Sequence, residues 1–250
     1  MEVHHSHHKA HEKKIKEYFL EFFMLFLAVT LGFLAENLRE NYVEKEREHQ
    51  YMESFVLDLE KDLINLQKAI PALEDRIAAI DSVFVYFKFH PNAKSLPVSV
   101  QSHIKRANWN FLAYRNVATI SQLKNAGGFR LVRNRLVADS IALYDMRWTR
   151  IEAAYERYYI SQHDIYTLEE QMLNAYDAID AYILNNKGFD NQNNIPNSTE
   201  VRFDATPLSQ YLNILARQQT VTAQDMRSYN FALIMTKNLI TLIKKEYKLH

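Results

Sequence analysis

The chain has 250 residues, 30 basic and 30 acidic side chains, and no cysteine. Without cysteine it can form no disulfide, thiolate metal site or cysteine nucleophile, and its zero net charge gives no overall attraction to nucleic acid. Four glycines and five prolines are far fewer than average, so turns should be few and elements long. Composition therefore predicts an all-α fold without strands.

The first 17 residues form a polar tail rich in histidine and lysine. If the tail were helical, His4 and His8 would lie one turn apart, as would His7 and His11, and each pair could share a transition metal. His5 completes the set. No carboxylate-rich surroundings fix a geometry, so the preferred interpretation is a disordered tail that binds metal adventitiously. An interrupted affinity tag is the alternative, and no cofactor is predicted.

Residues 18–35 are almost entirely apolar, and Glu21 is their one charged residue. As a helix they would be about 27 Å long, just enough to cross a hydrocarbon core. A cleaved signal peptide fits less well, because Phe33 occupies the small-residue position two places before Ala35. The segment predicts an uncleaved transmembrane anchor, with a buried core helix as the alternative. Glu21 would reach the headgroups or contact a partner helix.

The lysines around this segment predict its orientation. Four precede it and three basic residues follow it, a small excess that favours a cytoplasmic N-terminus. Residues 36–250 would then form a periplasmic helical domain carried by the bacterial inner membrane. We therefore expect the lipid bilayer to be one partner.

Apolar residues repeat at alternating steps of four and three from Leu38 to Phe87. Thirteen of these fifteen positions are apolar or aromatic, which predicts a coiled coil or helical bundle. The helix should kink or restart at Pro71 and end before Pro91. Within this stripe, the predicted interaction residues are Leu59, Leu63 and Leu66.

The rest of the chain predicts five further helical regions. Helices are expected over 98–115 and 117–126, with Gly127 and Gly128 as C-cap and turn. A long element follows over 134–184, and an Asn-rich loop over 185–206. Thr206 and Pro207 would open the next helix, and Thr222 with Asp225 would cap the last one.

Charge is unevenly distributed along the chain. Residues 36–75 hold 11 acidic and 5 basic side chains, whereas residues 105–150 hold 9 basic and 2 acidic ones. These segments would attract each other within one bundle or between subunits, unless both are simply solvated. Arg130, Arg133 and Arg135 are a candidate interaction cluster, with phosphate or lipid headgroups as a secondary interpretation.

Candidate chemistry is sparse. Glu46 and His49 resemble half of a carboxylate-bridged di-iron motif, but no second half was found in the soluble helices. The Gly127–Gly128 pair belongs to no phosphate-binding loop. Tyrosines over 155–166 have helical spacing that core packing explains better than a ligand cage.

Two blocks resemble a known group of proteins. The block His4–Asn37, containing KKIKEYFLEFFMLFLAVTLGFLAEN, is similar to an uncharacterised family of single-pass membrane proteins from Bacteroidetes-type Gram-negative bacteria. The segment Thr119–Asp145 is similar to a Ser…Leu-Lys…Gly…Leu-x-x-Asn…Leu pattern in related domains of unknown function, although it carries two glycines where one is expected. The resemblance implies an inner-membrane anchor with a helical extracytoplasmic domain. It implies no activity and no catalytic residues.

Together these features predict a structural function. The chain would be a scaffold or accessory subunit that associates with copies of itself or with a membrane protein. The alternative is a periplasmic ligand-binding or sensory module, weakened because neither a second span nor a signalling domain is present. An enzyme is not predicted, because no acid, base, nucleophile or metal set converges.

Overall fold

The computed structural model describes residues 15–125, 127–173 and 201–249. The chain divides into two compact units, Met1–Gln50 and Tyr51–His250. The histidine tail and most of the predicted Asn-rich loop lie outside the described residues. Helices dominate the described part of the chain, which confirms the all-α prediction.

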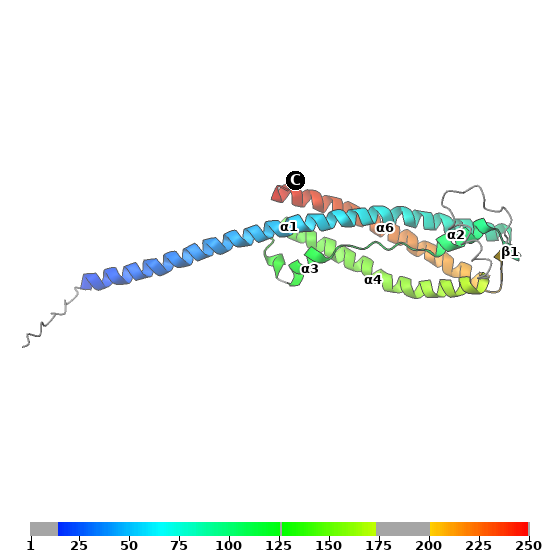
Figure 1. Ribbon diagram of the computed structural model, residues 1–250, viewed down its shortest axis with the longest axis horizontal. Coiled ribbons are helices and arrows are strands. Elements are labelled where there is room, and N and C mark those ends of the chain that lie inside the picture. Colours follow the sequence, from blue (N-terminus) through cyan, green and yellow to red (C-terminus); the bar gives the residue numbers. More distant parts are fainter. Residues whose placement is uncertain (1–14, 126, 174–200, 250) are drawn as a thin grey trace, which may run out of the picture. The chain divides into compact units, whose positions relative to one another are not determined.

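Helix α1 runs from Ile15 to Phe89 and belongs to both units (Figure 1). It ends two residues before Pro91, as predicted, but it passes through Pro71 without restarting. Within the first unit its side chains are nearly all exposed, including Phe22, which is 64% exposed. This apolar stretch is long and apolar enough to cross a membrane. It is the only such helix in the described ranges.

The second unit is a bundle built on α1 and two other long helices, α4 (Arg135–Met172) and α6 (Leu208–Tyr247). One core cluster joins the first part of α1 in this unit to the start of α4 and the end of α6. A second cluster joins the last part of α1 to the end of α4 and the start of α6. Helices α1 and α4 are therefore parallel, and α6 is antiparallel to both (Figure 1).

The fourth member of the bundle is only partly helical. Helix α2 (Val98–Asn108) ends seven residues before the predicted boundary, and residues 109–117 are non-helical before α3 (Ala118–Asn125) begins. A short 3-10 turn, η1 (Gly128–Arg130), follows α3. Gly127 has φ +65°, the left-handed conformation that the predicted turn requires.

The start of α4, the continuity of α6 and a short strand pair can each be compared with the sequence pattern. Asn134 caps α4, because its side chain accepts from the backbone N–H of Val137. Helix α6 is continuous from Leu208, so the predicted cap at Thr222 is wrong. Thr222 is instead buried inside the helix. The prediction of no strands is also corrected by a two-residue antiparallel pair, β1 (Ser95–Leu96) and β2 (Val201–Arg202).

Candidate functional site

The predicted site residues do not come together in one place. Leu59 and Leu66 are fully buried in the chain's own core, and Leu63 is partly buried beside them. Glu21 is exposed on the apolar stretch of α1, and the five tail histidines lie outside the described residues. The predicted arginine cluster is exposed after α3 and at the start of α4: Arg130, Arg133 and Arg135.

The deepest face of α1 shares every second position with the predicted stripe and differs from it by one residue at the positions between. Its fully buried positions follow alternating steps of three and four from Met52 to Phe87, and two of them are charged: Asp62 and Arg76. Each is 1% exposed. A purely apolar pattern skips charged residues, so it identifies neither of these two positions. Their regular position, 14 residues apart on one helical face, was the available signal.

The first buried cluster surrounds two carboxylates of α1. Asp62 accepts from the backbone N–H of Asn116 at 2.5 Å and from the hydroxyl of Tyr144. Asp58 accepts from the backbone N–H of Thr119 at 3.0 Å and from its hydroxyl at 2.7 Å. These carboxylates therefore bind polar groups at the start of α3, where free N–H groups favour negative charge.

Burial dominates the electrostatics of this cluster. It raises the pKa of Asp62 to about 6, although the hydrogen bonds from Tyr144 and Asn116 oppose the shift. The pKa of the Tyr144 hydroxyl is raised as well, first by burial and then by the neighbouring Asp62. Tyr144 thus remains a hydrogen-bond donor at physiological pH.

The second buried cluster surrounds Arg76. Its guanidinium donates to the carbonyl of Ala107 at 2.9 Å, the hydroxyl of Thr222 at 3.0 Å and the side-chain oxygen of Gln218 at 3.2 Å. Burial lowers the pKa of Arg76 from its ordinary value. Arg76 therefore connects α1 to both the end of α2 and the middle of α6.

Further side chains bind the non-helical segment from the other side. The hydroxyl of Tyr229 on α6 accepts a hydrogen bond from the N–H of Ala113 at 3.2 Å. The hydroxyl of Tyr155 on α4 donates to the carbonyl of Ala113. The side-chain amide of Gln162 donates to the carbonyl of Asn108 at 2.6 Å. All three long helices thus supply partners that replace helical hydrogen bonds.

Arg115 adds an ion-pair network at the surface of α4. Its guanidinium lies 2.8 Å from a carboxylate oxygen of Asp145 and 2.9 Å from one of Glu152, and Asp145 also pairs with Lys124. Arg115 is 6% exposed, so its charge is held in place by these partners. They raise its pKa, although burial acts against them as the largest single influence.

This arrangement is suited to holding a backbone segment. Its polar groups face one another and the segment, and across residues 15–125, 127–173 and 201–249 no group of three or more His, Cys, Asp or Glu side chains could hold a metal ion. Glu46 and His49 therefore form no such group there. The network holds this partly helical member of the bundle against the three long helices.

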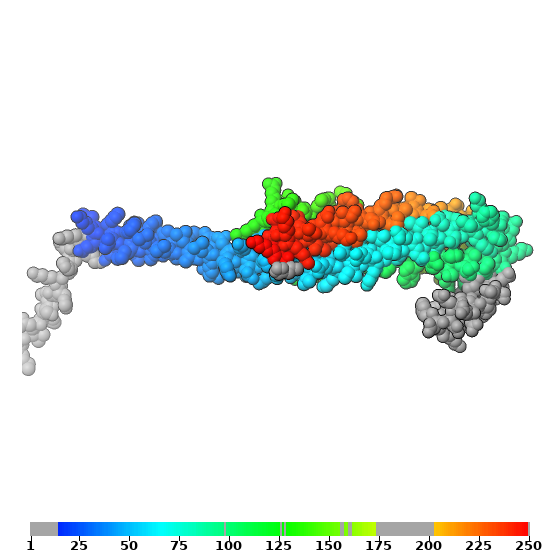
Figure 2. Space-filling model, turned by 90° about the horizontal axis from the view of Figure 1, so that it is seen from above, coloured from blue at the N-terminus to red at the C-terminus, as the bar shows by residue number. Residues whose placement is uncertain are grey.

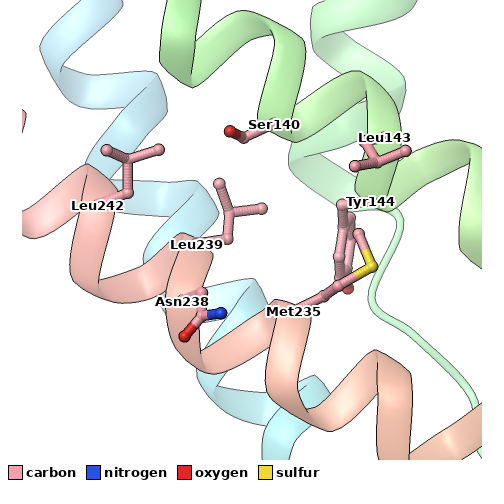
Figure 3. Close-up of a pocket in the computed structure, with 7 residues that line it drawn as sticks. All are labelled: Ser140, Leu143, Tyr144, Met235, Asn238, Leu239 and Leu242. Atoms are coloured by element: carbon pink, nitrogen blue, oxygen red, sulfur yellow. The ribbon is translucent and has the colours of Figure 1, made fainter.

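A shallow hollow lies between α4 and α6 (Figure 3). In the close-up, Leu143 and Tyr144 face Met235 and Leu239 across it. Its volume is about 180 Å³, which is below the 300–1,000 Å³ (roughly) of ordinary ligand pockets. The complete lining is Ser140, Leu143, Tyr144, Met235, Asn238, Leu239 and Leu242.

No protein-family description, curated protein or solved structure matches this chain. The resemblance of His4–Asn37 and Thr119–Asp145 to a family of single-pass membrane proteins stays a prediction.

Proposed function

We propose that this chain is a membrane-anchored structural protein, a scaffold or accessory subunit of an inner-membrane assembly. The observation that carries the proposal is that one helix, α1, holds both an exposed apolar stretch and the central face of a folded core. Leu25 and Phe33 are 68% and 71% exposed on that stretch. So much contiguous apolar surface needs a bilayer or a partner to cover it.

The second unit supports this proposal through what its buried residues do. The charged groups inside it bind the protein's own backbone. Such a fold can hold a fixed shape at the membrane and present its surfaces to other proteins. The predicted periplasmic location of this unit belongs to the same proposal. It is supported by the distribution of basic residues on either side of residues 18–35 and by the resemblance to single-pass membrane proteins.

The exposed apolar residues of α1 offer one surface for assembly. Leu57 and Ile64 are 58% and 49% exposed and lie one heptad apart. Leu59 and Leu66 are occupied within the core, so a second chain would not contact them in this fold. Assembly through α1 would therefore use Leu57 and Ile64 together with the apolar stretch.

Native mass spectrometry of the full-length protein, released gently from its own membrane, tests the proposal. We expect a defined multimer or a complex with another membrane protein, and the double change Leu57→Ser with Ile64→Ser should reduce it. Retention of the chain in the membrane pellet after carbonate washing tests the anchor separately. A lone 29.5 kDa chain would contradict the scaffold function.

The hollow between α4 and α6 favours a second candidate, a ligand-binding module. Its mainly apolar lining suits a small apolar molecule. Small apolar compounds should then raise the melting temperature, and Met235→Trp, which fills the hollow, should abolish the shift. If no compound stabilises the protein, this candidate fails and the scaffold proposal is unaffected.

A further inference from the structure

Three chain segments converge at the end of the second unit where α1 enters it. Tyr51, Phe129 and Tyr247 all pack against the same core cluster. The side-chain amide of Asn134 donates to a carboxylate oxygen of Glu246 at 2.8 Å, which joins the start of α4 to the end of α6. The C-terminal end of α6 lies at the surface there, in red (Figures 1 and 2).

This end is basic. Residues 128–135 and 244–249 carry six basic side chains and one acidic side chain, a net charge of +5. The acidic one, Glu246, is bonded to Asn134, and Lys244 lies 3.0 Å from Glu60 of α1. The basic side chains, all exposed except the partly buried Lys244, are Arg130, Arg133, Arg135, Lys244, Lys245 and Lys248.

A short tether connects this basic end to the apolar stretch. Only residues 36–50 lie between Ala35 and Tyr51, and as a helix they are about 22 Å long. If the apolar stretch is in a bilayer, this tether keeps the basic end within about 22 Å of the membrane surface. Anionic phospholipids attract basic clusters that lie close to a membrane-spanning helix.

We infer that the basic end of the second unit binds the anionic phospholipid headgroups of the membrane that carries the anchor. The inference rests on the proposed anchoring and adds a lipid-binding surface, formed by η1, the start of α4 and the end of α6. The arginines come from η1 and the start of α4, whereas the lysines come from the end of α6, so only the folded unit brings them together. Binding would hold this end of the bundle at the headgroups.

Energy transfer in vesicles tests the inference with the full-length chain. Because the protein has no cysteine, Thr241→Cys provides a single labelling site near the end of α6. The donor is attached there, and the acceptor is carried on lipid headgroups. We expect transfer to increase when phosphatidylglycerol is mixed into phosphatidylcholine vesicles, and the increase to disappear at high salt.

Matched variants identify the residues responsible. The triple change Arg130→Gln, Arg135→Gln and Lys245→Gln should abolish the phosphatidylglycerol-dependent increase. The control removes three exposed lysines elsewhere in the unit and should retain it: Lys88→Gln, Lys94→Gln and Lys105→Gln. Equal loss in both triple variants would overturn the assignment to this end.

Flotation with pure phosphatidylcholine vesicles distinguishes failure of the headgroup inference from failure of the proposed anchor. A chain that floats but shows no phosphatidylglycerol response overturns the headgroup inference and leaves the anchor intact. A chain that does not float overturns the anchor, and the inference with it. Inorganic phosphate should displace the unit no better than chloride at equal ionic strength. Stronger displacement by phosphate would instead identify a discrete phosphate site.

Discussion

At the scale of single residues, the core of this protein depends on two charged side chains of one helix. Asp62 and Arg76 occupy positions where most bundles place leucine, and each is 1% exposed. Burying a charge costs free energy unless hydrogen bonds compensate. Asn116 and Tyr144 donate hydrogen bonds to the carboxylate of Asp62. The guanidinium of Arg76 donates to the carbonyl of Ala107 and to side chains of α6. The two charges thus fix which segment packs against α1.

Asp62 should make stability depend on pH. Its pKa is raised to about 6 in the folded protein, so the folded state binds this proton more tightly than the unfolded state. The contribution is fully present below the unfolded pKa and is lost as pH rises through about 6. Relative to Asp62→Asn, the wild type should lose up to about 3 kcal/mol between about pH 4 and about pH 7.

Urea unfolding at the two pH values measures this effect, with fluorescence of the buried Trp148 as the reporter. The comparison with Asp62→Asn removes the contribution of the other titrating groups. An identical difference between the two proteins at both pH values would show that the Asp62 pKa is not raised.

Arg76 and Arg106 form a matched pair for a second prediction. Both bind partners in the bundle, but Arg76 is buried, whereas Arg106 pairs with Asp75 at the surface, 2.8 Å away. Arg76→Met leaves several buried acceptors without a donor and should cost at least about 3 kcal/mol of unfolding free energy. Arg106→Met should cost less than about 1 kcal/mol. Chemical denaturation measures both free energies. Similar losses for the two variants would contradict the structural role of the buried Arg76.

At the scale of elements, the non-helical segment 109–117 is the feature that distinguishes this bundle. Its backbone groups are bound by side chains of α1, α4 and α6 instead of by its own helix. Because those partners are fixed by the surrounding helices, the segment is held in an extended form. It therefore acts as a structural member of the bundle and connects α2 to α3.

Hydrogen exchange should detect these bonds one at a time. Amides of Ala113, Asn116 and Thr119 should be protected in the wild type, since each donates to a side chain of another helix. Asp58→Ala should increase exchange at Thr119 by at least tenfold, on the order of one lost hydrogen bond, and leave Ala113 protected. Mass spectrometry with fragmentation to single amides measures both. Uniform loss across the segment would mean that it opens as one unit.

At the scale of the whole molecule, α1 combines two kinds of surface. Residues 18–35 of α1 are apolar and exposed, whereas one face of its part in the second unit is buried in two successive core clusters. Opposite charges predicted from the sequence do meet in the second unit, as in the pair between Arg106 and Asp75. The charged ends and exposed apolar residues that remain are the surfaces available for a membrane or a partner.

Substitutions at two neighbouring positions of α1, Leu66 and Ile64, should affect folding and assembly differently. Leu66→Ala removes a fully buried side chain and should lower the unfolding free energy by about 2–5 kcal/mol. Ile64→Ser changes a half-exposed side chain and should leave stability nearly unchanged while it weakens any assembly. Denaturation and native mass spectrometry of both variants give the two readouts. A large stability loss for Ile64→Ser would assign this residue to the core.

The sequence alone determined the features that depend on local patterns. Composition and spacing predicted long helices, the apolar stretch over 18–35, the start of the long element at residue 134 and the turn at Gly127. Each follows from the chemistry of neighbouring residues, so no distant contact was needed to predict it.

Tertiary structure decided the features that depend on residues far apart in the chain. The segment 109–117 is non-helical because side chains from three helices bind its backbone, and α6 continues through Thr222 because Arg76 and the core hold that turn in place. Likewise, the face that α1 buries was set by Asp62 and Arg76. Their burial is favourable only when hydrogen-bond partners from α2, α6 and the segment 109–117 are present. The local spacing of residues in α1 cannot predict those partners.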